Sequence, residues 1–586
     1  MPSLQDLPAE LHRQILSTFV PRASPQWEVW NQFRTGQLGT GPDLEDAYDH
    51  ESPESLYNMC LVSKQFLAIA QPLLWSNFVD EGTLGDIEET VRIADNLYRY
   101  PELGQFVQDF TISGPILFNP EIADEDDLEI SEDQIQRLTT AIQALSLGAE
   151  EDKWISAVQN CDKYSDIPVW AALVFNKTPN LRRVVMPGTI SSVNPFPELF
   201  RRNPSFLRML EKLGLEGQKP ADGYDYASYN EFFALPNLKI VMFENGDLQS
   251  RTCPSWEPKT FNIEELVFRD SVIDAVSLSR LAGACKKLKV FLLDNFKAHE
   301  EWINHPNGGS VFNAAEAYQA LLPHKETLEH LRIEFARGVY DLQDWQRFVS
   351  SRAKIGSLRE FSALNDIRLQ QAIVPVHPQF PATLKRLYIT DCNSSVIDLV
   401  RNIARDCRKG LYPDFVEFRM LAVDITQPIL LPGQSIPDGQ TPEQAHQSLV
   451  DLFKGTNVDF FIAPFEMPDM DELMGGYGDD DDDEEGWEDE DEDDDDDDEH
   501  AIDGFDGFDD DVAYDSEGNQ IKDPFMDALR AARRGRAGRG GSRATRDGVI
   551  RGPNGPMPEG LLNYFMQQAM QDPEFLRLHP PSGGNQ

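Results

Sequence analysis

A short apolar motif that recurs along the chain constrains the fold more than any other feature of the sequence. In each copy an apolar residue is followed by two residues, a second apolar residue, one residue and a third apolar residue. From Leu238 onwards the first positions advance by 25, 25, 40, 30, 26 and 31 residues, counting a weaker copy at Leu358 and Phe361. A period of this size indicates a repeat architecture. The three apolar positions of the eight full copies are Val107, Phe110 and Ile112; Leu181, Val184 and Met186; Leu238, Val241 and Phe243; Ile263, Leu266 and Phe268; Leu288, Phe291 and Leu293; Leu328, Leu331 and Ile333; Leu384, Leu387 and Ile389; and Phe415, Phe418 and Met420.

The segments between the copies have a different periodicity, which is typical of helices. Residues 277–284, 314–322 and 396–403 place apolar side chains at helical spacing, as does the run from Asp86 to Leu97. Alternate residues of a short strand point to the same side, so each copy can add apolar side chains to a shared core that the intervening segment closes from outside. The sequence therefore predicts an α/β fold.

The repeated region, residues 81–428, resembles a leucine-rich-repeat domain of an irregular, helix-containing type. The Asn or Cys that usually follows the third apolar position of such repeats is matched only by Cys392. An ordinary α/β domain is the alternative. The resemblance implies a solenoid whose surface binds a protein.

Two apolar segments precede the repeats. The first, from Leu7 to Leu16, has Leu7, Leu11 and Ile15 at spacings of four, which predicts a helix with one apolar face. The second, from Leu56 to Trp75, has two apolar stripes at helical spacing, and Pro72 is expected to end its helix. A helix that is apolar nearly all round must be buried on more than one side, and two short helices are too small to bury it alone. A partner protein would supply the missing surface.

These segments resemble an F-box in the form common in fungal proteins. Leu7-Pro8-x-Glu10-Leu11 with Ile15-Leu16 is followed by Cys60-Leu61-Val62-Ser63-Lys64-x-Phe66 and by Pro72-Leu73-Leu74-Trp75. The resemblance covers residues 1–80, with an insertion at residues 21–54 that interrupts a usually continuous motif. It implies docking onto the Skp-type adaptor of a cullin ubiquitin ligase, while the rest of the chain selects the substrate. The alternative is that both segments are ordinary core helices. The resemblance implies that the following residues contact the adaptor: Leu7, Pro8, Glu10, Leu11, Ile15, Leu16, Leu61, Val62, Ser63, Phe66 and Trp75.

Charge is concentrated in one segment. The net charge is -48, but between Asp469 and Glu517 there are 29 Asp or Glu residues and no Lys or Arg, so the rest of the chain carries 71 acidic and 52 basic residues, or -19. An acidic body makes nucleic acid an unlikely partner, because phosphate binding needs basic residues. Six scattered cysteines without a CxxC pair indicate a reducing compartment. With no signal peptide and no run of 18 apolar residues, we expect a cytoplasmic or nuclear protein without a membrane span.

The end of the chain has a composition that cannot bury a core. Residues 429–468 are expected to form a linker and a closing segment, and residues 469–586 a disordered tail that is first acidic and then rich in Arg and Gly, with a short helix near its end. The acidic run could attract basic proteins such as histones or mask the seven arginines between Arg530 and Arg546. A solvated linker is the alternative for the Arg and Gly segment.

The motifs of catalysis are missing from the sequence. It contains no P-loop, no GxSxG and no HExxH, and the ten histidines are dispersed. We therefore expect no catalytic residues, no cofactor and no metal site. The prediction is a non-catalytic, substrate-recognition subunit of an SCF-type ubiquitin ligase that binds the Skp-type adaptor, the cullin core and an unknown protein substrate. The alternative is a repeat scaffold or a histone-binding protein that acts through the acidic tail.

Overall fold

The computed structural model divides the chain into two units, Met1–Phe465 and Glu466–Gln586. It describes residues 8–20, 54–80, 88–112, 131–160, 167–188, 194–217, 229–244, 246–248, 253–269, 271–295, 313–335, 353–393, 396–424, 442–463, 551–552 and 555–556. In the second unit the described residues form two short strands, β15 (Arg551–Gly552) and β16 (Gly555–Pro556). The acidic run, most of the Arg and Gly segment and the expected terminal helix lie outside the described residues.

Twelve strands of the first unit form one sheet. Every pair is parallel, and the order of the strands in the sheet is their order along the chain. The strands are β1 (Asn77–Asp80), β2 (Asp109–Ile112), β3 (Arg183–Pro187), β4 (Lys212–Glu216), β5 (Ile240–Glu244), β7 (Glu265–Arg269), β9 (Val290–Asn295), β10 (His330–Phe335), β11 (Asp366–Gln370), β12 (Arg386–Asn393), β13 (Glu417–Asp424) and β14 (Asp459–Ala463). Two short strands, β6 (Asp247–Leu248) and β8 (Val272–Ile273), pair beside it.

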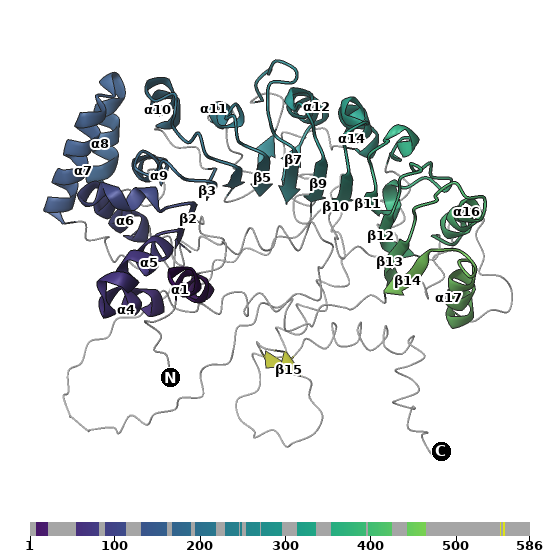
Figure 1. The fold of residues 1–586 in the computed structure, drawn as a ribbon. Coiled ribbons are helices and arrows are strands. Elements are labelled where there is room, and N and C mark those ends of the chain that lie inside the picture. Colours follow the sequence, from purple (N-terminus) through teal and green to yellow (C-terminus); the bar gives the residue numbers. More distant parts are fainter. Residues whose placement is uncertain are drawn as a thin grey trace, which may run out of the picture. The chain divides into compact units, whose positions relative to one another are not determined.

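Helices occupy many of the connections between the strands, as the spacing of apolar residues predicts. Figure 1 shows them as an outer row along the inner row of strands. The α/β class predicted from the sequence is confirmed. The helices are α6 (Glu88–Arg99), α7 (Glu132–Leu145), α8 (Glu151–Asn160), α9 (Ile167–Phe175), α10 (Phe196–Arg202), α11 (Asn230–Phe233), α12 (Ala275–Ala284), α14 (Ala314–Leu321), α16 (Ile397–Arg408) and α17 (Pro442–Asp451).

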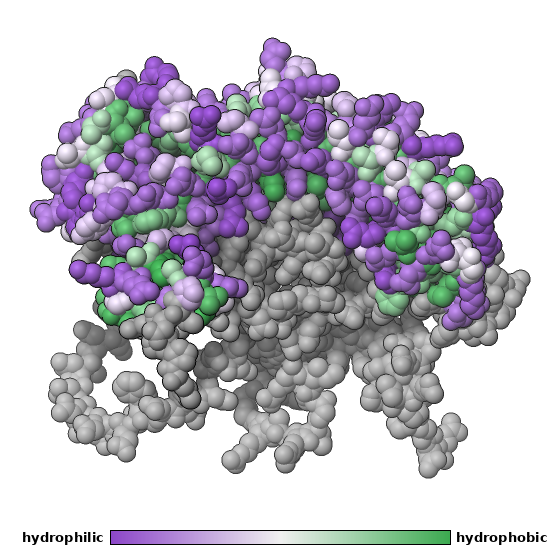
Figure 2. Space-filling model, viewed as in Figure 1, coloured by the Kyte–Doolittle hydropathy of each residue, from purple (hydrophilic) through white to green (hydrophobic). Residues whose placement is uncertain are grey.

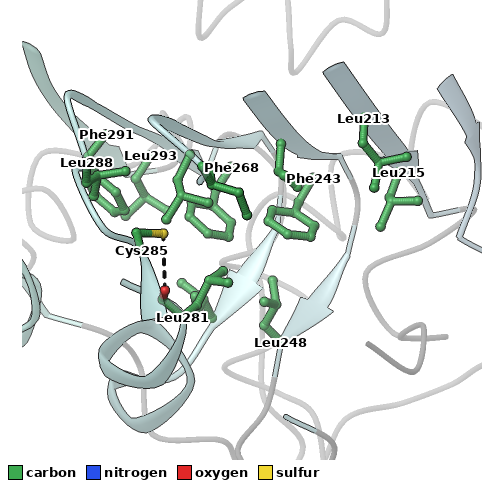
Figure 3. Close-up of a cluster of buried hydrophobic side chains, with 14 of the residues drawn as sticks. Leu213, Leu215, Phe243, Leu248, Phe268, Leu281, Cys285, Leu288, Phe291 and Leu293 are labelled. Atoms are coloured by element: carbon green, nitrogen blue, oxygen red, sulfur yellow. Dashed lines mark hydrogen bonds between the residues drawn. The ribbon is translucent and has the colours of Figure 1, made fainter. Parts of the chain in front are cut away.

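The second and third positions of the motif point toward these helices and form the core. Figure 3 shows the middle of this core, where Phe243, Phe268 and Phe291 come from three adjacent strands. The rings of Phe243 and Phe268 stack with centroids 5.0 Å apart. On the helix side, the Cys285 thiol donates a hydrogen bond of 3.3 Å to the Leu281 carbonyl. Each motif thus contributes one layer to a continuous apolar core.

Two strands carry copies of the same motif that are not among those identified from the sequence. Strand β4 has Leu210, Leu213 and Leu215 at the three positions, and all three are fully buried. Strand β11 uses Leu364, Ile367 and Leu369, so the placement of the weaker copy at Leu358 is wrong. Residues Leu358–Glu360 form a turn of 3-10 helix instead.

Four helices, α6 to α9, lie in the connections between β1 and β3 and contact one another. Helix α9 contacts α6, α8 and β3, and all nine of its residues are buried. Its sequence, IPVWAALVF, is apolar on every face, which suits a helix enclosed on all sides. No described helix is long and apolar enough to cross a membrane.

Candidate functional site

Within the first unit, three short helices at the N-terminus form a small group with its own core. They are α1 (Ala9–Leu16), α4 (Glu54–Val62) and α5 (Lys64–Leu74). Leu16, Leu56 and Phe66 pack together with Ile69 and Ala70 at the centre. The ring of His12 is also buried and lies 5.0 Å from the ring of Phe66. Five buried apolar residues make a small core, so most of the surface of these helices has to face outward.

Ser63 divides what the sequence suggests is one helix into two. Its backbone is extended, and its hydroxyl accepts a hydrogen bond of 3.2 Å from the Phe66 amide, which caps the start of α5. The prediction that Pro72 ends the helix is wrong, because α5 continues to Leu74. Pro72 cannot donate a hydrogen bond to the Ala68 carbonyl, but this loss falls in the last turn of α5, which the hydrogen bond from the Trp75 amide to the Gln71 carbonyl still closes.

The three N-terminal helices leave large apolar side chains exposed to solvent. Six of the twelve exposed large apolar residues in the described part of the chain lie on these three helices, with exposed fractions between 39% and 68%. Figure 2 shows hydrophobic surface at the lower left, where Figure 1 places α1 and α4. The six residues are Leu11, Ile15, Tyr57, Leu61, Val62 and Leu67, and we call them the apolar face. Exposed apolar side chains gathered in this way are typical of a protein-binding surface.

The structure places the residues that the F-box resemblance implies in three different environments. Leu11, Ile15, Leu61 and Val62 belong to the apolar face, and Pro8 and Glu10 are exposed beside it. Leu16 and Phe66 are buried in the core of this group of helices, so they support the surface from beneath. Ser63 is half-buried at the helix cap. Leu7 and the insertion, apart from Glu54, lie outside the described residues.

Two members of the apolar face were missed from the sequence. Tyr57 precedes Leu61 by four residues and therefore shares a face of α4 with it. Leu67 belongs to an apolar stripe that also includes Leu56, but only Leu56 is buried. Spacing identifies both as helical apolar residues. It does not reveal which face becomes exposed, because the helical phase changes at Ser63.

Trp75 joins the three helices to the sheet. Its amide donates a hydrogen bond of 3.1 Å to the Gln71 carbonyl at the end of α5, while its side chain packs against the core of the sheet. The next carbonyl, of Ser76, accepts hydrogen bonds of 2.9 Å from the Gln108 amide and 3.1 Å from the Asp109 amide. The chain therefore passes from α5 into β1 without a linker. Trp75 is a residue of this joint rather than of the apolar face.

The face of the sheet opposite the helices carries a second, smaller cluster of buried side chains. Residues paired in register form a central row across it, and the row is apolar from β3 to β9, where it reads Val185, Gly214, Met242, Val267 and Leu292. The apolar side chains belong to a buried cluster that is separate from the main core. At Gly214 a Cβ atom would lie 3.1 Å from Val185 Cγ2 and 3.2 Å from Met242 Cε, so glycine lets these two side chains approach each other.

The same row becomes charged at β10, where a buried ionic cluster begins. Arg332 Nη2 lies 2.8 Å from Asp294 Oδ2, Arg332 Nε donates 2.5 Å to Glu334 Oε2, and Arg368 Nε donates 2.9 Å to Glu334 Oε1. All four side chains are at most 9% exposed. Burial lowers the pKa of Arg332, although the neighbouring carboxylates oppose this. Buried ion pairs add little net stability compared with apolar residues, but removing one partner of such a pair is strongly destabilising.

Other buried titratable groups have structural roles. His324 Nε2 lies 2.8 Å from the Ala282 carbonyl oxygen, and its Nδ1 accepts a 3.3 Å hydrogen bond from the Leu288 amide, so it connects successive repeats. Burial lowers the pKa of His324 and raises the pKa of the Cys285 thiol to about 12. A thiol with so high a pKa is a poor nucleophile. Among the described residues, no three His, Cys, Asp or Glu side chains are grouped to hold a metal ion.

Comparisons with known proteins give no family assignment: neither the search against protein-family models nor the search of the curated proteins finds a match.

Proposed function

We propose that this protein is a non-catalytic substrate-recognition subunit of an SCF-type cullin ubiquitin ligase. The observation that carries the proposal is the apolar face, because three small helices expose six large apolar side chains that a bound partner would bury. The partner is the Skp-type adaptor, through which the cullin core is recruited. Cytoplasm and nucleus are the compartments in which such a complex would act.

The remainder of the first unit is proposed to bind the substrate as an irregular leucine-rich-repeat solenoid. Parallel strands in chain order, with helices in many of the connections between them, support this reading. The substrate is an unidentified protein that binds a surface of the sheet. Ubiquitin transfer itself would belong to other subunits, and this chain would contribute proximity.

Co-purification with the adaptor tests the docking step. We expect the full chain to bind a Skp-type adaptor at micromolar concentration. The double substitution Leu11→Asp and Ile15→Asp should weaken this binding by at least about 100-fold, because each unpaired carboxylate in an apolar interface costs roughly 2 kcal/mol or more. Both residues are exposed, so the variant should still fold.

Val276→Asp is the matched control. Val276 is also an exposed apolar residue, at 48%, but it lies on α12, outside the three helices. It should leave adaptor binding unchanged. Wild-type protein that shows no association with the adaptor would rule out the proposal, as would equal losses in the two variants.

A second candidate function is the binding of basic proteins, such as histones, through the acidic run. The run favours it, because 29 carboxylates without a basic residue attract cationic segments strongly at low salt. Deleting residues 469–517 distinguishes the two functions. Loss of basic-protein binding with intact adaptor binding and substrate turnover would make the tail a separate activity.

A further inference from the structure

The lysines of the first unit gather at the edge of the sheet where the strands begin. The twelve strands are parallel and therefore all start at the same edge. The described part of the chain contains fourteen lysines, and ten of them lie between a strand of the sheet and the element that precedes it. Lysine is thus concentrated at one edge of a protein that is acidic as a whole. The ten are Lys177, Lys239, Lys259, Lys286, Lys287, Lys289, Lys325, Lys385, Lys409 and Lys454.

Five of these lysines come from three segments that lie side by side. The segments are residues 236–239, 257–264 and 285–289, which lead into β5, β7 and β9, and Figure 1 shows these three strands in succession. The Glu264 amide donates a hydrogen bond of 2.7 Å to the Lys239 carbonyl, and the Lys289 amide donates one of 2.7 Å to the Glu264 carbonyl. We call the five residues the lysine rim: Lys239, Lys259, Lys286, Lys287 and Lys289.

The lysine rim has more positive charge than its own segments neutralise. The three segments contain five lysines and two carboxylates, Glu257 and Glu264, so their net charge is +3. Glu264 is shared between two lysines, because Lys239 Nζ lies 2.7 Å from Glu264 Oε1 and Lys289 Nζ lies 2.6 Å from Glu264 Oε2. Both lysine side chains still expose more than 40% of their surface. They can therefore contact a further anion.

The other three lysines of the rim are exposed and lack a carboxylate partner. Lys259, Lys286 and Lys287 form no ion pair with a carboxylate of the described residues. Lys286 Nζ donates a hydrogen bond of 2.7 Å to Asn262 Oδ1, which is neutral. The C-terminus of α12 lies at the same place, because the Gly283 carbonyl accepts a hydrogen bond of 3.0 Å from the Lys259 amide. A helix C-terminus carries about half a negative charge, which offsets only part of three positive charges.

The surroundings of the rim favour an acidic protein segment over nucleic acid. Glu326 and Glu329 lie in the segment that leads into the next strand, β10, so a long phosphate backbone would meet negative charge as it left the rim. None of the exposed large apolar residues in the described part of the chain lies in the three segments, so they offer no aromatic ring on which a base could stack. Neighbouring strands are about 4.8 Å apart, so three or so extended residues span the distance of about 10 Å from β5 to β9.

We propose that the lysine rim binds a short acidic segment of a partner protein, which crosses the starts of β5, β7 and β9 with its carboxylates on the lysines. Ammonium groups on flexible side chains are point charges, so they accept Asp and Glu residues in several arrangements. The rim therefore selects for a run of carboxylates rather than for one particular peptide. The proposal depends neither on the N-terminal helices nor on adaptor binding.

Fluorescence anisotropy with the full chain tests the proposal. The probe is a labelled peptide of about eight residues that are mostly glutamate, and the reference peptide has glutamine in place of each glutamate. At about 50 mM salt we expect the glutamate peptide to bind at least about tenfold more tightly than the reference. The triple substitution Lys259→Gln, Lys286→Gln and Lys287→Gln should weaken the glutamate peptide by about tenfold, because three exposed charge contacts of modest strength are lost. The three lysines are exposed, so the urea midpoint should not change.

The matched control changes three other lysines at the same edge of the sheet. Lys385→Gln, Lys409→Gln and Lys454→Gln remove the same total charge, and all three residues are exposed, but they precede β12, β13 and β14. This variant should bind the glutamate peptide within about twofold of the wild-type protein. Equal losses in the two triple variants would overturn the proposal, because they would show that only the net charge of the protein matters.

Two further measurements test other occupants of the rim. If a single-stranded oligonucleotide of about eight nucleotides binds more tightly than the glutamate peptide and loses more affinity in the rim variant, the rim is a nucleic-acid site and the proposal is wrong. If the peptide binds only after residues 469–517 are deleted, the rim holds the chain's own acidic run, which also overturns the proposal. Failure of the peptide to bind with or without this deletion has the same consequence.

Discussion

Arg332 lies at the centre of the buried ionic cluster. It contacts both Asp294 and Glu334, and Glu334 also contacts Arg368, so two positive and two negative side chains share one buried region. Replacing Arg332 removes a buried guanidinium that contacts two carboxylates, Asp294 and Glu334. We expect Arg332→Met to reduce the free energy of unfolding by about 3 to 5 kcal/mol, measured by urea denaturation.

The control for that prediction is Arg182→Met. Arg182 also pairs with a carboxylate, Glu211, at 2.7 Å, but both side chains are more than 40% exposed, so the loss should stay below about 1 kcal/mol. Adding Glu334→Gln to Arg332→Met restores the charge balance and should recover part of the lost stability. If the two single variants lose equal stability, the buried cluster has no special energetic role.

The ion pairs of Glu264 should contribute less to the free energy of unfolding at acidic pH than at pH 7. Burial raises the pKa of its carboxyl. Hydrogen bonds from Lys239 and Lys289 lower this pKa by more than burial raises it, so the net shift is downward from the ordinary 4.5. A lowered pKa means that Glu264 contributes its full stability above about pH 4.5 and loses it as the pH falls through the folded-state pKa. Glu264→Gln should therefore destabilise the protein at pH 7 and have a smaller effect near pH 3. Urea denaturation at both pH values measures this, and a constant difference would contradict it.

At the level of elements, Ser63 determines how the N-terminal helices are arranged. Its hydroxyl caps α5, and its extended backbone separates α5 from α4. We expect Ser63→Ala to lower the stability of these helices by about 1 kcal/mol, whereas Ser63→Asp keeps the cap and most of the stability. Hydrogen exchange of the α5 amides measures the change. Equal protection in all three proteins would show that the break does not depend on the cap.

The strands could be predicted from the sequence because burial imposes a strict pattern on them. From β2 to β13, each strand of the large sheet buries two alternate residues and the residue three before them, so Leu288, Phe291 and Leu293 already indicate β9. Strand β4 fits the same rule, with Gly214 between its two leucines where the other strands have larger residues. The motif could not indicate β14, because Asn457 takes the first apolar position there.

The apolar face could be predicted only in part, because exposure depends on packing. The spacing of apolar residues in the sequence groups Leu16 with Leu11 on one side of α1, yet in the structure Leu16 is buried and Leu11 is 44% exposed. What decides between them is the position of α5, which contacts α1. Contacts between helices depend on the tertiary fold rather than on the spacing within one helix. The ionic cluster was missed for the same reason, because Asp294, Arg332 and Arg368 lie far apart in the sequence and are brought together by strand pairing.

At the scale of the whole molecule, the first unit should be stable without the second. The two units divide after Phe465, and β14 completes the sheet just before this point. We expect a chain ending at residue 465 to unfold at the same urea concentration as the full chain. A chain ending at residue 457 lacks β14 and exposes Phe418 and Phe453, which pack against Phe460, and it should lose about 2 kcal/mol or more. Equal midpoints for the two shortened chains would contradict this.

The order of the strands also affects how the protein can fold while it is being made. Each of the eleven strands after β1 pairs with the strand of this sheet that precedes it in the chain, so none of these eleven has to wait for a partner that the ribosome has not yet released. The longest delay falls between β2 and β3, where α7, α8 and α9 are synthesised first. Among the described strands, one edge of the growing sheet then stays at β1 and the other is always the newest strand, until β14 is the last strand to emerge.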